Sequence, residues 1–413
     1  MIEEKIFENK AEMERVILVG LSDEENLDEL EELVRTAGAC AVGRMTQERS
    51  QPDNATYLGS GKLQELSMMV EALDATGIVC DDELSPAQIG NMERVLQTKI
   101  MDRTLLILDI FAARASTSEG KIQVELAQLR YRMTRLRGFG TSLSRLGGGI
   151  GTRGPGEKKL ETDKRLIKDR ISGLKRELEE VKCHREVQRS QRKKNRIPVA
   201  AIVGYTNAGK STLLHALTGA EVLQEDKLFA TLDPTTRELK LPSGQEMLLT
   251  DTVGFINKLP HHLVDAFRST LEEAKHADLI IHVADASNEK VELQMMTVYE
   301  TLRELGISDK PIFTLFNKQD CIQGDISLRD VRAQKIIWIS ARTGAGLSDI
   351  LETLEVYLRE NRMLLERVFS YQDAGKISYV RQFGELIEER YTENGIYIKA
   401  YLPKEWYTKI ALS

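Results

Sequence analysis

Cysteine is scarce in this sequence, and its few occurrences follow no recognisable pattern. The chain contains four: Cys40, Cys80, Cys183 and Cys321. Their spacing predicts neither a disulfide framework nor a cysteine metal site. Apolar runs of membrane-spanning length are also lacking, and the first residues contain no apolar signal region. We therefore expect a reduced, cytoplasmic protein without a membrane anchor.

Basic charge is in deficit over the whole chain but concentrated in one segment. The 413 residues carry a formal net charge of −7. Residues 130–196 nevertheless contain 21 Lys and Arg against 8 Asp and Glu, a local charge of +13 that leaves −20 on the rest. A solvated charged helix is the commoner meaning of such a run. A local basic segment on an acidic chain also suits a nucleic-acid partner.

The length exceeds what one compact core normally supports, so two or three domains are expected. In residues 1–115, short apolar runs alternate with helical patterns, which is typical of an α/β arrangement. The predicted strands are 16–20, 39–43, 77–80 and 99–101, and the predicted helices are 25–36, 62–74 and 86–97. The glycine-rich stretch 57–62 lacks the spacing of a phosphate-binding loop and is interpreted as a turn before a helix.

Residues 116–196 contain two heptad patterns on either side of a glycine-rich segment. The apolar positions are Ile122, Leu126, Leu129, Met133 and Leu136 in the first, and Ile167, Ile171, Leu174, Leu178 and Val181 in the second. Spacings of four and three are those of a coiled-coil seam. With a non-helical segment at 138–156 between them, the patterns predict a long antiparallel helical hairpin. The basic run 182–196 would continue the second helix and then form a linker.

Arginines surround this glycine-rich segment, at Arg135, Arg137, Arg145 and Arg153, together with Phe139. Glycine permits close backbone approach to a phosphate chain, and arginine binds phosphates or stacks on bases. Glycine richness alone would favour a disordered linker. The two matched heptad patterns favour RNA contact instead, with Arg137, Arg145 and Arg153 as the candidate residues.

The stretch 204–211 reads Gly-Tyr-Thr-Asn-Ala-Gly-Lys-Ser, which matches G-x-x-x-x-G-K-S. It follows the apolar run Val199–Val203 and precedes a helical pattern at Thr212–Leu217, the context that a phosphate-binding loop requires. Backbone N–H groups and the helix N-terminus would bind the phosphates. Lys210 would reach the β- and γ-phosphates, and Ser211 would hold Mg²⁺.

Three further motifs follow in the order found in GTPases, each at the end of a predicted strand. Residues 251–254 read Asp-Thr-Val-Gly (D-x-x-G), 317–320 read Asn-Lys-Gln-Asp (N-K-x-D), and 340–342 read Ser-Ala-Arg. Asp251 would act on Mg²⁺ through water, and the Gly254 N–H would sense the γ-phosphate. The carboxylate of Asp320 accepts from guanine N1–H and its 2-amino group, a donor pair that adenine does not present.

Strands near 199, 248, 279, 312 and 336 alternate with helices near 211, 262, 291 and 347, which predicts an open doubly wound sheet over residues 197–362. The switch I threonine is open among Thr231, Thr235 and Thr236, all in the expected loop. After Gly254 stands Phe255, where Ras-like enzymes place a water-orienting glutamine. We therefore expect slow intrinsic hydrolysis that a partner accelerates.

These residues resemble the HflX family of ribosome-associated GTPases, within the Obg–HflX group. The resemblance covers nearly the whole chain, and it is carried by 204–211, Phe229-Ala-Thr-Leu-Asp-Pro-Thr235, Asp251-Thr-Val-Gly-Phe255 and Gly154-Pro-Gly-Glu157. It implies an α/β multidomain protein with an N-terminal α/β subdomain (1–115), the helical hairpin (116–196) and a doubly wound P-loop GTPase domain (197–362). The chain also carries a small α+β C-terminal domain (363–413). In the last, Glu393-Asn-Gly395 predicts a β-hairpin between 386–391 and 396–402.

The resemblance also implies which residues contact the nucleotide and the metal. Catalysis would rest on Lys210, Thr231 and Gly254, and Mg²⁺ would be held by Ser211 and Thr231. Asn207 stands where some potassium-dependent relatives place asparagine, which makes K⁺ a second candidate ion. The implied GTP contacts are Gly204, Tyr205, Thr206, Asn207, Ala208, Gly209, Lys210, Ser211, Phe229, Ala230, Thr231, Leu232, Asp233, Asp251, Thr252, Val253, Gly254, Asn317, Lys318, Gln319, Asp320, Ser340, Ala341 and Arg342.

The expected function is GTP hydrolysis stimulated by the large ribosomal subunit, with splitting or rescue of stalled or idle ribosomes under stress. The expected partners are that subunit with its rRNA, and GTP or GDP; nothing demands a dimer, so a monomer is expected. A second hypothesis is an RNA-binding GTPase that checkpoints large-subunit assembly. A third, a membrane-linked switch, is disfavoured by the missing anchor signal.

Overall fold

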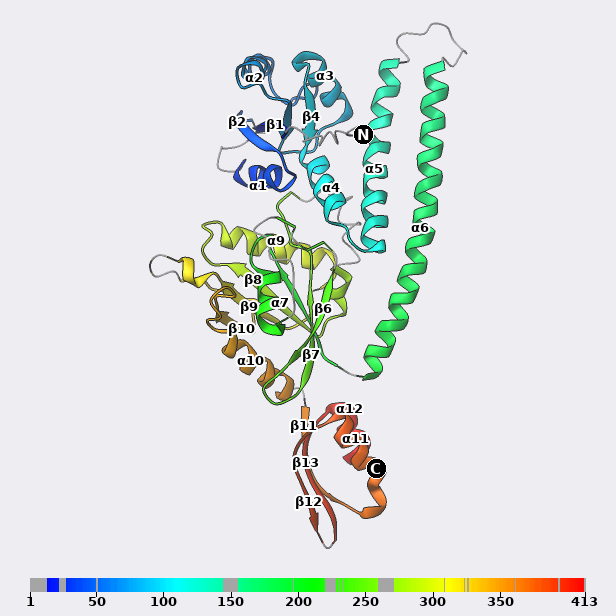
Figure 1. The fold of residues 1–413 in the computed structure, drawn as a ribbon, viewed down its shortest axis with the longest axis vertical. Helices are drawn as coiled ribbons and strands as arrows, with labels where there is room; N and C mark the ends of the chain where they lie inside the picture. Colours follow the sequence, from blue (N-terminus) through cyan, green and yellow to red (C-terminus); the bar gives the residue numbers. More distant parts are fainter. Residues whose placement is uncertain are drawn as a thin grey trace, which may run out of the picture. The chain divides into compact units, whose positions relative to one another are not determined.

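A computed structural model describes most of the chain (Figure 1). The described residues are 13–21, 27–49, 51–143, 155–195, 197–219, 228–229, 231–232, 234–258, 271–307, 309–322, 324, 327–360, 362–392 and 394–411. The chain forms two compact units. The first comprises Met1–Arg185, Glu225–Asp233 and Val253–Leu271, and the second comprises Glu186–Gln224, Pro234–Thr252 and Glu272–Ser413.

The N-terminal part of the first unit is a four-stranded parallel sheet of order β2-β1-β3-β4. Its strands are β1 (Arg15–Gly20), β2 (Cys40–Thr46), β3 (Gly77–Cys80) and β4 (Lys99–Asp102), and its helices are α1 (Asp28–Thr36), α2 (Ser60–Ala72), α3 (Pro86–Leu96) and α4 (Arg103–Arg114). Figure 1 shows α2 and α3 on one side of the sheet and α1 and α4 on the other. The predicted strands and the first three helices are confirmed.

Local chemistry explains where these helices begin. Helix α3 starts with a capping box in which Ser85 and Gln88 satisfy each other's backbone N–H groups, and Pro86 occupies the first helical position. The stretch 57–62 was predicted as a turn before a helix, but only 57–59 precede α2, and Ser60–Lys62 are its first residues. Apolar residues of β1, β3, α2 and α3, including Ile17, Ile78 and Leu66, form one buried cluster between the sheet and these helices.

Helix α4 is an element that the sequence analysis did not predict. It begins directly after β4, where the Asp102 carboxylate accepts from the Leu105 N–H at 2.9 Å and caps the helix. Seven of its twelve residues are buried. Because apolar residues lie around most of its circumference, the helical period that marks an amphipathic surface helix is weak.

The predicted hairpin is present as two long helices, α5 (Ser118–Leu143) and α6 (Pro155–Asn195). Ile122 and Leu126 of α5 pack with Ile171 and Leu174 of α6, so the heptad seam is confirmed. Within the described ranges, none of the helices combines the length and apolarity that a membrane span needs. The basic run is helical as far as Asn195.

The predicted non-helical segment 138–156 was too long. Helix α5 continues through Gly138 and Gly140 to Leu143, and α6 begins at Pro155. A glycine in an exposed helix costs only about 1 kcal/mol relative to alanine, which a packed 26-residue helix absorbs. Proline is favoured in the first helical turn, where its missing N–H has no partner to lose. Residues 144–154 lie outside the described ranges.

The second unit contains a six-stranded sheet of order β10-β9-β8-β5-β7-β6. Its strands are β5 (Val199–Gly204), β6 (Thr235–Lys240), β7 (Glu246–Asp251), β8 (Leu279–Asp285), β9 (Ile312–Asn317) and β10 (Lys335–Trp338), and its helices include α7 (Lys210–Thr218), α9 (Val291–Glu304) and α10 (Leu347–Glu360). One buried cluster joins the sheet to α7 and α10 through residues such as Leu213, Ile281 and Leu354.

One strand of this sheet was not predicted, and one predicted helix lies outside the described ranges. Strand β6 was missed, and it pairs antiparallel with β7, so the sheet is mixed. The five predicted strands are confirmed and pair in parallel. The predicted helix near 262 lies in 259–270, outside the described ranges, although residues 271–276 are helical.

The C-terminal part of the second unit is a small antiparallel sheet of order β11-β13-β12. It comprises β11 (Arg362–Phe369), β12 (Glu385–Thr392) and β13 (Gly395–Pro403), with helices α11 (Ala374–Phe383) and α12 (Lys404–Ala411). Thr392 pairs with Gly395, which confirms the predicted hairpin. Helix residues Ile377, Val380 and Ile410 pack against the sheet, so this part is α+β with its own core.

Candidate nucleotide-binding site

The phosphate-binding loop connects β5 to α7 and needs glycine at two positions. At Gly204, a Cβ would lie 2.2 Å from the carbonyl oxygen of Val283 on the neighbouring strand. Gly209 has φ +92° and is the N-cap of α7; a Cβ there would lie 2.2 Å from Nδ2 of Asn317. Both glycines therefore allow a backbone approach that a side chain would block. The loop precedes a helix N-terminus, as phosphate binding requires.

Lys210 is the buried cation of this loop. Its ammonium donates to the carbonyl oxygen of Tyr205 at 2.7 Å, which holds the side chain back across the loop. Burial lowers the pKa of Lys210 to about 8, against the opposing influence of the Asp251 charge. An anionic ligand would relieve this cost, because it supplies the opposite charge that favours the ammonium form.

The first two D-x-x-G residues end β7 beside the loop. The hydroxyl of Ser211 donates to Oδ2 of Asp251 at 2.8 Å, and Asp251 is fully buried. The hydroxyl of Thr252 donates to the carbonyl oxygen of Ile202 and ties β7 to β5. A serine hydroxyl next to a carboxylate is a donor set of hard oxygens, which is what Mg²⁺ prefers. These residues fit the expected ion.

Asn317 joins three motifs at the carboxyl end of β9. Its Nδ2 donates to the carbonyl oxygen of Ala208 in the phosphate-binding loop at 2.8 Å. Its Oδ1 accepts from the N–H of Ala341 in the Ser-Ala-Arg loop at 2.9 Å. Asn317 is only 3% exposed. The structure therefore brings the phosphate loop and the two predicted base-recognition loops together through one side chain.

The rest of N-K-x-D is arranged around this anchor. Lys318 has φ +63°, and its ammonium pairs with Oδ2 of Asp285 at 2.7 Å. The Gln319 N–H donates to the carbonyl oxygen of Ile339, next to the Ser-Ala-Arg loop. A hydrogen bond from Ser340 is the largest cause that holds the pKa of Asp320 below its ordinary value, so this exposed carboxyl is ionised at neutral pH.

Asp285 is a residue that the sequence analysis missed. It ends β8, adjacent to the end of β9, and it orients the lysine of N-K-x-D. Its position at the carboxyl end of a parallel strand was visible in the sequence, because that is the edge where such sheets bind ligands. The pairing with Lys318 was not visible.

The predicted switch residues belong to the first unit. Phe229, Leu232 and Val253 are buried, and Gly254 is buried with them; Thr231 is half-buried. Ala230 and Asp233 lie outside the described ranges. Of the three switch I threonine candidates, Thr235 and Thr236 are in β6 rather than in a loop, and the Thr236 hydroxyl bonds that of Thr250 at 3.0 Å.

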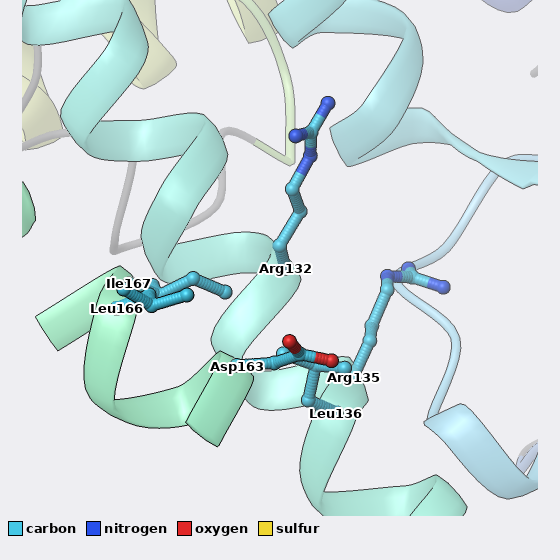
Figure 2. A pocket seen from close by; sticks show the side chains of 6 residues that line it. All are labelled: Arg132, Arg135, Leu136, Asp163, Leu166 and Ile167. Atoms are coloured by element: carbon cyan, nitrogen blue, oxygen red, sulfur yellow. The ribbon is translucent and has the colours of Figure 1, made fainter. Parts of the chain in front are cut away.

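The predicted RNA-contacting arginines can be placed only in part. Arg137 is in α5, with its side chain outside the described set, and Arg145 and Arg153 lie outside the described ranges. The described part of the hairpin contains an open pocket of about 460 Å³ (Figure 2). It is lined by Arg132, Arg135 and Leu136 of α5 and by Asp163, Leu166 and Ile167 of α6.

Comparison with known proteins agrees with this geometry along the chain. Residues 24–112 match a family model described as the N-terminal part of GTP-binding GTPases, and residues 114–192 match their middle region. Residues 199–318 match a model described as a 50S ribosome-binding GTPase. A GTPase HflX of Lacrimispora saccharolytica is 62% identical over 413 residues, with 98% of each chain covered.

The chain belongs to the HflX family of GTPases.

Other relatives extend this result to distant bacteria. GTPase HflX of Caldanaerobacter subterraneus is 51% identical, with 94% of this chain and 90% of the relative covered. GTPase HflX of Escherichia coli K12 is 45% identical, with 80% and 79% covered. A crystal structure of SsGBP with GDP is 29% identical, with a TM-score of 0.49 over 84% of this chain and 98% of that one. As an HflX-family protein, the chain is a GTPase with a ribosome-binding GTPase domain.

Proposed function

We propose that this GTPase binds the large ribosomal subunit, which stimulates its hydrolysis of GTP, and that it splits or rescues stalled or idle ribosomes. The observation that carries the proposal is the anchoring of two predicted base-recognition loops and the phosphate loop by Asn317, on a chain that also carries a long basic helical hairpin. The first feature suits a guanine-nucleotide switch. The second suits a partner that is rich in phosphate.

The proposed chemistry assigns a role to each part of the site. Residues 204–211 bind the phosphates, and Lys210 neutralises charge that develops on the transferred group. Asp320 recognises guanine, and Lys318, Gln319 and 340–342 surround the base. Thr231 orders switch I, while the Gly254 N–H contacts the γ-phosphate. The full set of GTP contacts is the one that the resemblance implies.

The metal is proposed to be Mg²⁺, held by Ser211 and Thr231, with Asp251 acting through water. Ser211 and Thr231 would supply hydroxyl oxygens to the ion, and the ion would supply positive charge that offsets the charge of the phosphates. Asn207 has φ +59° in the loop and is the proposed contact for K⁺. Phe255 is buried and apolar, so it cannot orient the attacking water. Because Phe255 stands where Ras-like enzymes have the water-orienting glutamine, we propose that intrinsic turnover is slow and that the ribosome accelerates it.

The proposed domain organisation keeps the bounds 1–115, 116–196, 197–362 and 363–413. GTP would order the switch segments and favour a ribosome-binding state. The hairpin would bring Arg137, Arg145 and Arg153 to rRNA, and hydrolysis would release the factor afterwards. We further propose that the protein acts as a monomer in the cytoplasm, under stress.

A sedimentation experiment tests this function. Intact ribosomes are incubated with the protein and GTP and separated on a sucrose gradient, with Lys210→Ala as the matched nucleotide-binding control. We expect conversion to subunits with the unmodified protein and none with the control. Joint replacement of Arg137, Arg145 and Arg153 by glutamine should abolish the conversion and leave GTP binding intact.

The alternative is a GTPase that checkpoints large-subunit assembly, since it would use the same nucleotide site and the same basic hairpin. It predicts binding to free large subunits or their precursors without conversion of intact ribosomes. Intact ribosomes that persist in the gradient, together with protein that cosediments with large subunits, would favour this alternative and contradict splitting.

A further inference from the structure

Helix α4 contacts the hairpin at its first turn. The capping residue Asp102 is fully buried. It accepts from the hydroxyl of Tyr131 and from the guanidinium of Arg135, each at 2.7 Å. Both donors belong to α5, and the Arg135 guanidinium also lies over the Tyr131 ring at 3.9 Å. The residue that starts α4 is therefore held by two side chains of the hairpin.

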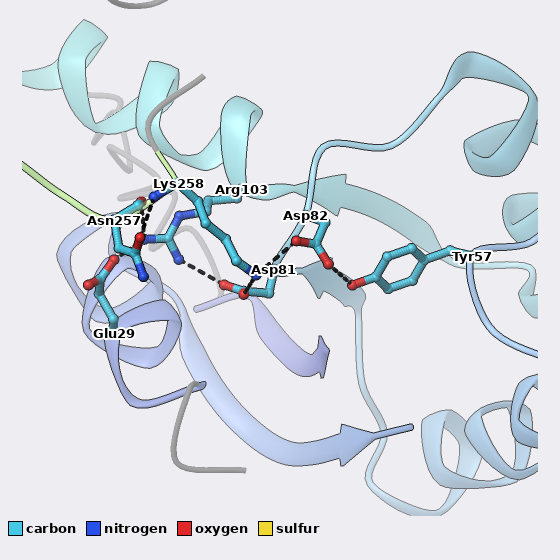
Figure 3. Close-up of polar contacts among 7 residues, drawn as sticks. All are labelled: Glu29, Tyr57, Asp81, Asp82, Arg103, Asn257 and Lys258. Atoms are coloured by element: carbon cyan, nitrogen blue, oxygen red, sulfur yellow. Dashed lines mark hydrogen bonds and ion pairs between the residues drawn. The ribbon is translucent and has the colours of Figure 1, made fainter. Parts of the chain in front are cut away.

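The next residue contacts the segment that follows D-x-x-G. The Arg103 guanidinium donates to Oδ1 of Asp81 at 2.8 Å and to the carbonyl oxygen of Asn257 at 3.0 Å, and it pairs with Glu29 (Figure 3). Arg103 is 3% exposed. A buried, charge-assisted hydrogen bond to a backbone carbonyl constrains where that backbone can lie. Asn257 is three residues beyond Gly254.

Lys258 adds a second attachment beside the first. Its ammonium contacts Oδ2 of Asp81 at 2.5 Å and Oδ1 of Asp82 at 2.8 Å, and Asp82 in turn accepts from the hydroxyl of Tyr57 at 2.6 Å (Figure 3). Lys258 has φ +51°, a left-handed conformation that non-glycine residues rarely adopt. Such a conformation costs about 1–3 kcal/mol and persists only where surrounding contacts hold it.

Switch I is attached to the same helix. The ring of Phe229 packs edge-to-face on the ring of Phe111, with centroids 4.7 Å apart, and both side chains are buried. Phe229 also has a left-handed backbone, with φ +55°. The N-cap residue Asp102 thus contacts the hairpin. Within α4, Arg103 contacts the segment after D-x-x-G (255–258, here the switch II segment), and Phe111 contacts the switch I segment at Phe229.

We infer that α4 transmits contact at the hairpin to both switch segments, and that Arg103 and Lys258 are positioning residues for GTP hydrolysis. The Arg135 guanidinium is partly exposed and points away from Asp163, Leu166 and Ile167 in Figure 2, toward Asp102, so an RNA phosphate that reached it there would compete with Asp102. That competition alters the cap of α4 and, through Arg103, the backbone at Asn257. The inference rests on the proposed stimulation by large ribosomal subunits.

The test separates stimulation from subunit binding. Hydrolysis is measured over a range of large-subunit concentrations for the unmodified protein, Lys258→Ala, Lys258→Arg, Arg135→Gln and the Lys258→Ala/Arg135→Gln double variant. Lys99→Ala is the matched control, because Lys99, in β4, also pairs with a carboxylate, that of Glu14 just before β1, at 2.8 Å. Thermal melting and binding of a fluorescent GDP analogue check that each variant is folded and loads nucleotide.

We expect Lys258→Ala to lower the maximal stimulated rate about fivefold or more, in the range of typical coupling between sites. The subunit concentration for half-maximal stimulation should stay within about twofold, because the hairpin still binds. Lys258→Arg should recover most of the rate. The double variant should lose no more than the stronger single variant, since both interrupt one connection.

A stimulated rate in Lys258→Ala equal to that of Lys99→Ala would overturn the inference while leaving the proposed function standing. So would a loss that appears only as a raised half-maximal concentration, because that would report binding. If large subunits fail to stimulate even the unmodified protein, the proposed function fails first, and the inference fails with it.

Discussion

Two sets of nucleotide-site segments in this chain differ in how they are supported. The phosphate loop, Asp251, N-K-x-D and Ser-Ala-Arg are all held by the six-stranded sheet, with Asn317 linking three of them. The switch segments belong to the first unit, where they contact α4 and the residues after β3. One set is supported within the GTPase domain, and the other by residues far away in sequence.

This difference suggests a division of labour. Segments that bind guanine, ribose and phosphate need one geometry in every nucleotide state, so a rigid sheet suits them. Segments that respond to the γ-phosphate must change. Their attachment to the domain that includes the hairpin offers a route by which an external partner sets the hydrolysis rate. Under the proposed function, such a chain would bind nucleotide through the first set and hydrolyse it slowly when alone.

The largest effect is expected from Asp320→Asn, which tests the sheet-supported set at the base. The amide cannot accept from both guanine N1–H and the 2-amino group, so GTP affinity should fall by about 10³-fold or more. Xanthosine triphosphate, which presents a carbonyl at the corresponding position, should bind the variant better than GTP does. Competition binding with both nucleotides measures this, with the exposed Asp349→Asn as control. Unchanged preference for GTP would contradict the role of Asp320.

Asn317→Ala should come next, because it disconnects the sheet-supported set. It leaves the buried Ala208 carbonyl and Ala341 N–H without their partner, at about 1–3 kcal/mol each. We expect a loss of roughly 100-fold in GTP affinity by titration with a fluorescent analogue. Asn317→Asp keeps the acceptor for Ala341 but sets a second carboxylate oxygen against the Ala208 carbonyl, so it should lose at least as much. A much smaller loss in Asn317→Asp than in Asn317→Ala would show that the link to Ala208 does not matter.

A pH experiment probes the sheet itself through His282. This residue lies in β8 at 1% exposure, faces Tyr299 of α9 with ring centroids 5.2 Å apart, and has Asp330 at 3.9 Å. Burial lowers the pKa of His282 to about 4, with the Asp330 charge opposing this and the Lys210 charge adding to it. In the unfolded chain, histidine has an ordinary pKa near 6.5, so His282 binds a proton between pH 6.5 and 4 in the unfolded state but not in the folded state.

Stability should therefore fall as the pH drops from 6.5 toward 4, by about 2 kcal/mol from His282 at pH 5. His282→Gln should remove that part of the slope. Urea unfolding at pH 7 and pH 5, with the half-buried Trp338 and Trp406 as fluorescent probes, measures the difference. If both proteins lost the same stability between the two pH values, His282 would be protonated in the folded state.

The smallest effect concerns the switch-supporting set. Phe229→Ala removes the edge-to-face contact with Phe111, worth about 0.5–1.5 kcal/mol beyond burial. The maximal rate with large subunits should fall about two- to tenfold, while affinity for GDP changes little, because the contacts proposed for switch I are made with GTP. Phe229→Leu, which keeps apolar bulk, should recover part of the rate. An equal loss of GDP affinity in Phe229→Ala would show that Phe229 supports binding of either nucleotide rather than coupling to α4.

The nucleotide motifs and most of the fold were predictable because they depend on local patterns. Short apolar runs that end in motif residues predict parallel strands of a nucleotide-binding sheet, and β5, β7, β8, β9 and β10 followed that rule. The hairpin was predictable because Ile122, Leu126, Ile171 and Leu174 keep a strict heptad spacing. The glycines at 138 and 140 do not end α5, because a helical glycine costs only about 1 kcal/mol relative to alanine.

Other features depended on contacts that no local pattern reports. Strand β6 reads Thr-Thr-Arg-Glu-Leu-Lys, a largely polar edge strand that only its pairing with β7 identifies. The contacts of Arg103 with Asn257 and of Lys258 with Asp81 span 154 and 177 residues. Each of these side chains alone looks like ordinary surface charge. Arg103 is buried and Lys258 is partly exposed, and their shared contacts with Asp81 emerge only when the chain is folded.

The most direct test of the account is GTP hydrolysis by the purified protein alone, with small ribosomal subunits and with large ribosomal subunits. The account predicts slow turnover alone, little change with small subunits and strong stimulation by large subunits, lost in the variant without Arg137, Arg145 and Arg153. Fast turnover that is indifferent to either subunit would contradict it, because the switch segments would then need no external partner.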